Sequence, residues 1–396
     1  MTAMTNRALS PPFLRLYALA FLFFSANAIL NVILPLRSEA LGASNGQIGL
    51  IMGAYMFTCM FFRPLAGQLI HKHGPASVLR ILLIVNGLAL VVYSFAGVEG
   101  YVAARMMQGI CTAFFSMSLQ IGIIDALPEE QRSQGVSLYS LFTYMPTIIG
   151  PLLAIGIWDW GGMGAFTVAM IAIALVTGLF GYSVPIQSAQ PIQSVQPQSM
   201  GGSIRQLVRQ RPLLVCSALM LGISVVFGAV TAFIPLYSKQ VSGGHSGVFL
   251  MIQASVIVTG RFVFRTRIPS DGKWPAGFVC TVCLLASVGA MLLSLSLAWG
   301  PLAFYVAAVT IGVAQALLYP TLISYLSFVL PGAARNAMIG WFLAAADLGV
   351  SMGGGALGPV ADRYSYSVMY GAAAGLAVLA ACLVVLNRTD NRSRSE

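Results

Sequence analysis

The chain has 396 residues, of which 58% are hydrophobic and only 8% are charged, and its mean hydropathy is +0.85. A soluble domain carries about 25% charged residues, so this chain has too little polar surface to cover a water-soluble globule. The composition excludes a cytosolic enzyme, a secreted disulfide scaffold and a disordered protein. Its long apolar runs indicate a polytopic membrane protein made of helices, because barrel strands would show short alternating patterns.

The six cysteines and the net charge of +10 have simple interpretations in this setting. The spacing of Cys280-x-x-Cys283 is typical of redox and zinc sites, but the pair lies in an apolar run without a nearby histidine or acid. His71-x-His73 is too shallow and too poor in partners to hold a metal. We therefore predict packing roles for the cysteines, no metal site and no cofactor. The basic residues are scattered through short loops, which favours anionic lipid over nucleic acid as their partner.

Apolar stretches of about 20 residues predict an all-α protein with twelve transmembrane helices. These helices lie near 14–36, 46–70, 77–97, 101–125, 134–157, 163–184, 213–237, 247–267, 275–298, 301–328, 336–358 and 366–386. With both termini in the cytoplasm, 15 of the 21 Lys and Arg residues lie on the inner side, 3 lie outside and 3 lie within spans. The positive-inside rule selects this orientation, and we expect no cleavable signal before the first helix.

A segment rich in Gln, Ser and Pro, residues 186–212, predicts a flexible cytoplasmic linker between an N-terminal bundle, 1–185, and a C-terminal bundle, 213–396. The two halves share five features in the same order. These are Pro-Leu-x-Ser at 35–38 and 235–238, Gly fourteen positions before Arg at 49/63 and 247/261, Tyr-Val-Ala-Ala at 101–104 and 305–308, Pro four positions before Arg at 128/132 and 331/335, and Gly eighteen positions after those arginines at 150 and 353. We interpret the chain as a 6+6 repeat whose bundles enclose a site near the middle of the membrane.

Two motifs carry a resemblance to a known family. The segment from Gly67 to Gly74 follows the pattern G-x-L-a-D-r-x-G, with His71 in place of the usual Asp. The fourth predicted helix, with Arg105 followed by Gln108 and Gly109, follows the pattern R-x-x-q-G. Over essentially its whole length the chain resembles the major facilitator superfamily of secondary transporters. This resemblance implies alternating access, but the acid of the family's charge-based latch is absent at His71.

The fifth predicted helix carries Gly150-Pro151, which partly resembles a motif that marks antiporter-type exporters in this family. Its repeat partner in the eleventh helix is the glycine-rich segment around Gly353. Proline and glycine weaken a helix locally, which permits bending or close sliding between bundles. Ordinary helix packing explains these residues equally well.

A polar stripe runs along the fourth predicted helix at spacings of 3, 4, 4 and 4, and consists of Arg105, Gln108, Thr112, Ser116 and Gln120. Within a lipid bilayer such a stripe must face protein or a water-filled cavity. A structural seam between helices is the alternative to a cavity. Arg105 favours the cavity because an arginine needs a charged or hydrated partner, although it also lies near enough to the outer boundary to extend partly toward the headgroups.

Three arginines and one acid are predicted within the spans. Arg63 and Arg261 are repeat-related and lie in the cytoplasmic third, where they can face a cavity or extend to lipid headgroups. Asp347 lies about 18 Å from the inner end of its helix at 1.5 Å per residue. Burial favours the protonated form of a carboxylate, so Asp347 is our candidate for proton coupling. A static ion pair with an arginine and a packing hydrogen bond are the alternatives.

Three arginines against one acid predict a positive cavity and a cargo that carries carboxylates. We predict cargo contacts from polar and aromatic residues of the spans: Asn27, Asn31, Tyr55, Arg63, Arg105, Gln108, Gln120, Tyr144, Gln253, Arg261, Tyr319 and Trp341. The predicted function is proton-coupled export of a small anionic or zwitterionic molecule, such as an opine-type metal chelator, by a monomer in a prokaryotic cell membrane. A multidrug antiporter for lipophilic compounds and an uptake symporter are the alternatives. An ion channel would not need the repeat, and the sequence shows no enzyme constellation.

Overall fold

The computed structural model describes residues 7–183, 210–264, 267–269, 272–331 and 335–392, and this part of the chain forms helices without any strand. In chain order the helices are η1 (Arg7–Leu9), α1 (Pro11–Ala40), α2 (Asn45–His73), α3 (Pro75–Phe95), α4 (Val98–Ala126), α5 (Glu129–Ser183), α7 (Arg211–Tyr237), α8 (Ser246–Val263), α9 (Ala276–Trp299), α10 (Pro301–Val329), α11 (Arg335–Gly355), α12 (Gly358–Arg363) and α13 (Tyr366–Arg392). Most of the predicted linker, 186–212, lies outside the described residues.

Helix α5 contains two membrane crossings. It is 55 residues long, and its helical geometry is interrupted at Gly161 and Gly162, where Gly162 has φ 53° and ψ −133°. A positive φ is easily adopted by glycine but disfavoured by residues with a side chain, so the chain turns at this point. The predicted spans 134–157 and 163–184 correspond to the two arms.

Nine helices in the described part of the chain meet the length and hydropathy required to cross a membrane, with α5 counted once. The second arm of α5, together with α2 (29 residues) and α11 (21 residues), brings the number of crossings to twelve. At 1.5 Å per residue, about 20 residues are enough to span the hydrocarbon core. The predicted twelve-helix fold is thereby confirmed.

Proline and glycine mark several helix starts. Gly74 has φ 79° and precedes Pro75, the first residue of α3. Gly300 has φ 76° and precedes Pro301, the first residue of α10. Proline suits the first helical position because its missing N–H would have no partner there. These short turns explain how long apolar helices can follow one another with few connecting residues.

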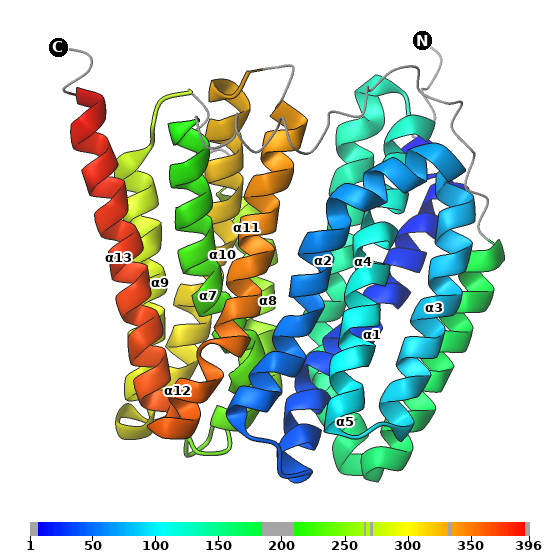
Figure 1. Cartoon of the computed structure of the whole chain (residues 1–396), viewed down its shortest axis with the longest axis horizontal. Helices are drawn as coiled ribbons and strands as arrows, with labels where there is room; N and C mark the ends of the chain where they lie inside the picture. Colours follow the sequence, from blue (N-terminus) through cyan, green and yellow to red (C-terminus); the bar gives the residue numbers. More distant parts are fainter. Residues whose placement is uncertain (1–6, 184–209, 265–266, 270–271, 332–334, 393–396) are drawn as a thin grey trace. The chain divides into compact units, whose positions relative to one another are not determined.

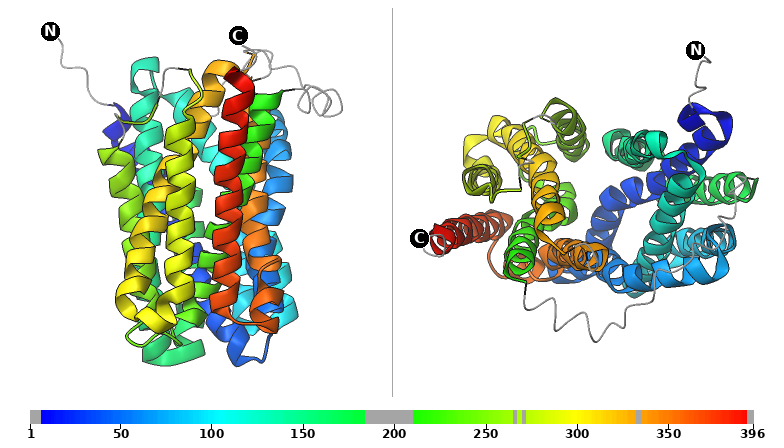
Figure 2. Two further views of the ribbon diagram at one scale, coloured as in Figure 1. Left: turned by 90° about the vertical axis from the view of Figure 1, so that its left-hand side faces the viewer. Right: turned by 90° about the horizontal axis from the view of Figure 1, so that it is seen from above.

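The helices form two compact units. The N-terminal unit comprises residues 1–33 and 61–197, and the C-terminal unit comprises residues 34–60 and 198–396. In the N-terminal unit α3 packs against α4 and α5, and in the C-terminal unit α11 packs against α7 and α13 against α9. The right-hand view of Figure 2 shows the helices of each unit end-on. The packing places residues 34–60, the last part of α1 and the first part of α2, in the C-terminal unit, while the predicted division at the linker remains a prediction.

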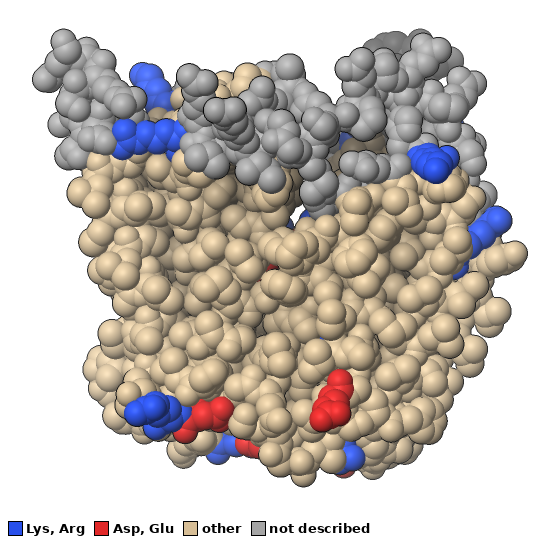
Figure 3. All heavy atoms as spheres, in the orientation of Figure 1, with Lys and Arg blue, Asp and Glu red and all other residues tan. Residues whose placement is uncertain are grey.

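Large apolar side chains cover much of the surface. Phe95, Trp160 and Leu302 are 79%, 89% and 76% exposed. Charged side chains on the face shown in Figure 3 concentrate toward the ends of the helices, and uncharged residues form the surface between them. A surface of this kind suits acyl chains rather than water, so the buried polar residues become the informative ones.

Candidate functional site

A buried arginine lies at the centre of a polar cluster in the N-terminal unit. The side chain of Arg105 on α4 has no exposed surface. Its Nη1 donates to Oδ1 of Asn27 at 2.8 Å and to Oε1 of Gln108 at 3.2 Å, and its Nη2 donates to Oδ1 of Asn31 at 2.7 Å. We call Asn27, Asn31, Arg105 and Gln108 the Arg105 cluster. Four of the residues predicted from the sequence therefore meet at one place.

The positions of these residues on their helices explain the cluster. Asn27 and Asn31 are four residues apart on α1, and Arg105 and Gln108 are three apart on α4, so each pair lies on one helix face. Both asparagines are half-buried, whereas Gln108 is 1% exposed. The alternative that Arg105 extends partly toward the lipid headgroups is wrong, because its side chain is fully buried and amide oxygens on α1 and α4 bind its guanidinium.

The three acceptors in these contacts are neutral amides. Hydrogen bonds to an ionised donor are short and strong, and the 2.7 and 2.8 Å distances agree with this. Neutral acceptors orient the guanidinium but contribute no opposite charge. These hydrogen bonds hold the positively charged guanidinium of Arg105 between α1 and α4.

Tyr93 on α3 contacts the Arg105 cluster through Gln108. This residue was not predicted from the sequence. Its hydroxyl donates to Oε1 of Gln108 at 3.0 Å, and its ring centroid lies 6.1 Å from that of Tyr101. Gln108 therefore accepts from both Tyr93 and Arg105. The signal available in the sequence was the spacing of Asn86 and Tyr93, two polar residues seven positions apart on one face of the helix.

The remainder of the predicted stripe on α4 divides in two. Thr112 is 6% exposed, and Ser116 donates to the carbonyl oxygen of Thr112 at 2.8 Å within the helix. Gln120 is half-buried. Thr112 is therefore buried in the protein, and the cavity expected along the stripe remains a prediction.

A second polar contact lies in the C-terminal unit. Nε2 of Gln253 on α8 donates to Oε1 of Gln315 on α10 at 3.2 Å, and Gln253 is 7% exposed. Gln315 was not among the predicted residues, although it stands four positions before Tyr319 on the same face. The ring of Tyr319 stacks on Phe342 with centroids 6.1 Å apart.

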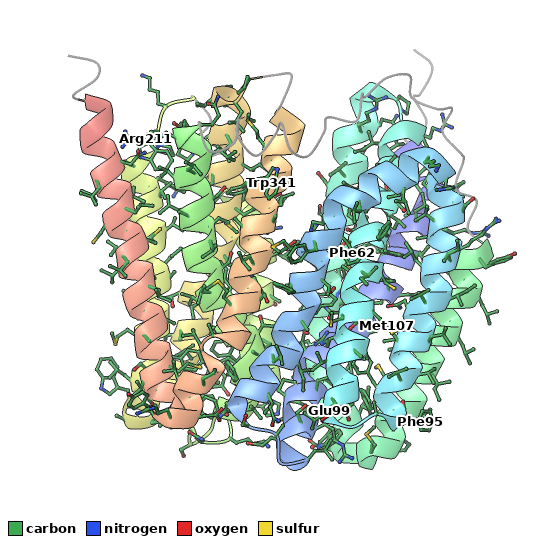
Figure 4. All side chains as sticks on the ribbon, viewed as in Figure 1. Phe62, Phe95, Glu99, Met107, Arg211 and Trp341 are labelled. Carbon is green, nitrogen blue, oxygen red and sulfur yellow. The ribbon has the colours of Figure 1, made fainter. Side chains whose placement is uncertain are left out.

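The other predicted residues occupy different environments. Arg63 is half-buried and close enough to Tyr139 on α5 to interact with it electrostatically. Tyr55 and Asp347 are 4% and 9% exposed, and Trp341 on α11 is 38% exposed (Figure 4). Tyr144 and Arg261 are half-buried. Gly67 and His71 lie in α2, but their side chains are outside the described residues.

The predicted motif glycines are positions of close helix packing. A Cβ on Gly150 would lie 2.5 Å from Cβ of Ala28 on α1, and a Cβ on Gly353 would lie 2.3 Å from the carbonyl oxygen of Val225 on α7. Pro151 is buried beside Gly150 in α5. Such contacts require glycine at these positions whether or not the helices also slide.

Twelve apolar crossings, with a buried polar cluster in each of the two units, are typical of a polytopic membrane transporter. The family model of the Major Facilitator Superfamily matches residues 16–354, and the chain belongs to this family. It is therefore a multi-pass transporter of the cell membrane.

Three comparisons illustrate the relationship. The chain is 50% identical over 367 residues to the staphylopine export protein of Staphylococcus aureus (strain Mu50), which covers 92% of each chain. It is 26% identical over 355 residues to an uncharacterized MFS-type transporter of Burkholderia mallei (strain SAVP1), covering 86% of this chain and 84% of that one. The crystal structure of the nucleoside transporter NupG matches with a TM-score of 0.76 over 95% of this chain and 99% of that one. At 14% identity the last comparison shows the fold alone.

Proposed function

We propose that this transporter exports a small carboxylate-bearing metabolite of the opine-metallophore type, loading it from the cytoplasm and driven by protons that move inward. The staphylopine export protein, 50% identical over 92% of the chain, supports both the direction and the class of cargo. The single structural observation that carries the proposal is the fully buried guanidinium of Arg105, which is bound by neutral amides.

The Arg105 cluster suits reversible binding of a carboxylate. A carboxylate offers the guanidinium a bidentate, charge-assisted interaction that an amide oxygen cannot offer. In the proposed cycle the cargo carboxylate replaces one or both asparagine oxygens, and they return when the cargo leaves. The buried charge then stays hydrogen-bonded in every state, which avoids the large penalty of an unpaired buried arginine.

Asp347 on α11 is the proposed proton-coupling residue. It is 9% exposed, as expected for a carboxylate that exchanges protons within the membrane rather than at the surface. In the proposed cycle a proton from outside neutralises Asp347 after cargo release and favours the return of the empty carrier. We further propose that both termini lie in the cytoplasm and that one chain is the transporting unit.

The test is transport by purified protein in proteoliposomes under an imposed proton gradient, with opine-type, other carboxylate, zwitterionic and lipophilic cationic compounds. Arg105→Gln should lower carboxylate transport about tenfold or more, because hydrogen bonds to charged groups contribute about 1.5–3 kcal/mol. Arg80→Gln is the matched control, since Arg80 is an exposed arginine of the same unit that lies over the Tyr182 ring at 5.0 Å. It should transport like wild type.

The results separate cargo from coupling. Carboxylate transport that is unchanged in Arg105→Gln would contradict the proposed cargo site. If the protein transports lipophilic cations but no carboxylates, a multidrug antiporter would be favoured instead. If Asp347→Asn retains full gradient-driven transport, the coupling residue is a different one.

A further inference from the structure

An exposed carboxylate of α12 binds the beginning of α2. Oδ1 of Asp362 accepts from the backbone N of Asn45 at 2.7 Å, and Oδ2 accepts from the backbone N of Gly46 at 2.8 Å. The hydroxyl of Tyr366, at the start of α13, donates to Oδ1 of Asn45. All these residues belong to the C-terminal unit, although 317 positions separate Asp362 from Asn45.

The beginning of α2 also has a cap of its own. Oγ of Ser44 accepts from the backbone N of Gln47 at 3.2 Å, and Oε1 of Gln47 accepts from the backbone N of Ser44 at 2.9 Å. This reciprocal pair is a capping box, which satisfies the N–H of the third helical residue. Asp362 accepts from the N–H groups of the first two helical residues, Asn45 and Gly46, which the capping box does not satisfy. Because a local cap already starts the helix, the main consequence of the Asp362 contact is that it joins two distant segments.

The carboxylate is also well placed electrostatically. The first N–H groups of a helix carry a partial positive charge, so a carboxylate that binds them is stabilised by charge as well as by hydrogen bonds. The side chains of Glu39, at the end of α1, and Lys239, after α7, form an ion pair at 2.6 Å in the same unit. That pair is about half exposed and contributes little by itself.

Below this contact the backbones of α2 and α11 touch directly. A Cβ on Gly49 would lie 2.1 Å from the carbonyl oxygen of Gly354, and a Cβ on Gly53 would lie 2.6 Å from that of Ser351. A Cβ on Gly358, the first residue of α12, would lie 2.4 Å from the carbonyl oxygen of Asn45. Small residues that allow such close approach are typical of helix contacts within membranes. The first turns of α2 therefore pack closely against α11, and Asp362 binds α2 at its N-terminal end.

We infer that Asp362 is a gating residue of the transport cycle, which holds the outer ends of α1 and α2 against α11 and α12 and so stabilises the state that is closed to the outside. Both α1 and α2 continue from the C-terminal unit into the N-terminal unit. Alternating access requires the outer ends of such helices to part, and the Asp362 contact must break for this to happen. The sequence lacks the family's acid at His71, in the last turn of α2, and Asp362 supplies a charged latch at the opposite end of α2.

The test measures the opening directly and needs no cargo. Spin labels at Leu41→Cys and Tyr364→Cys, both exposed positions, report the distance between the α1–α2 connection and α12 in nanodiscs, with the native cysteines replaced by alanine. Asp362→Ala should increase the long-distance population about two- to fivefold, the factor that corresponds to a carboxylate at an exposed helix N-terminus. Asp362→Asn should give a smaller increase, because an amide oxygen can still accept one hydrogen bond.

Matched variants distinguish gating from general damage. Asp159→Asn, an exposed acid on the same predicted side of the membrane, should leave the distances unchanged. Gly354→Ala should open the contact as Asp362→Ala does, whereas Gly355→Ala should not, because a Cβ on Gly355 meets nothing within 4 Å.

Distances in Asp362→Ala that match those of wild type would overturn the inference, and so would equal opening in Gly354→Ala and Gly355→Ala. If Asp362→Ala does not fold, the glycine pair decides alone. A failure of the proposed cargo in the transport assay would leave these distances unaffected, so the two proposals can fail separately.

Discussion

Nη2 of Arg105 donates to Oδ1 of Asn31 at 2.7 Å across two helices, and the acceptor is an amide where a carboxylate would neutralise the arginine. Asparagine and aspartate have nearly the same shape. The difference between them at this position is therefore almost purely one of charge, which makes Asn31 a sensitive probe of how the cluster binds an anion.

We expect Asn31→Asp to raise the KM for carboxylate cargo about tenfold, which corresponds to about 1.4 kcal/mol. The new carboxylate would remain bound to Arg105 and compete with that of the cargo. Initial rates in proteoliposomes at several cargo concentrations measure the effect. An amide analogue of the cargo is the control, because its KM should change little, and an unchanged KM for the carboxylate would show that cargo binds elsewhere.

Tyr93→Phe should lower the free energy of unfolding by about 1 kcal/mol, the usual contribution of one hydrogen bond. The variant keeps the ring next to Tyr101 but removes the donor to Gln108. Thermal unfolding in detergent measures the loss. Tyr101→Phe is the matched control, since the buried hydroxyl of Tyr101 has no hydrogen-bond partner among the described residues, and removing it should be neutral or stabilising. Equal losses in both variants would contradict a specific role for the hydroxyl of Tyr93.

The sequence identifies this cluster only in part. Helical periodicity places Asn27 with Asn31 and Arg105 with Gln108, since residues three or four apart share a face. It does not say which faces meet, so the contact between α1 and α4 emerges only from the structure. The sequence does not single out Tyr93, because one tyrosine in an apolar span is usually a packing residue.

The crossings and the latch show the two extremes of what a sequence can reveal. The twelve spans follow from the thickness of the bilayer, which fixes how many apolar residues a helix needs. No comparable local rule predicts the contacts of Asp362. It lies in a six-residue helix after a glycine-rich segment, and its partners are 316 and 317 positions away. A hydrogen bond between side chain and backbone over that separation leaves no periodic pattern to read.

The amide pair Gln253 and Gln315 should be strongly coupled in stability. Either Gln253→Leu or Gln315→Leu leaves one amide of the pair without its partner, at a cost of about 1–3 kcal/mol. The double variant removes both amides and should regain much of that loss, because no orphaned amide remains. A double-mutant cycle of thermal unfolding in detergent measures the coupling. Thr281→Val, on an exposed face of α9, should combine additively with either variant, and additive losses within the glutamine pair would contradict the contact.

Gly150→Ala should destabilise the N-terminal unit by about 1–3 kcal/mol, because the added methyl group would overlap Cβ of Ala28 at 2.5 Å. Gly156→Ala on the same arm of α5 is the matched control. A Cβ there meets nothing within 4 Å, so the variant should be neutral or gain up to about 1 kcal/mol of helix propensity. Combining Gly150→Ala with Ala28→Gly restores the space and should recover most of the loss in thermal unfolding. If unfolding recovers in the double variant but transport does not, Gly150 serves the movement of α5 against α1 as well as its packing, which is the distinction that the partial exporter motif leaves open.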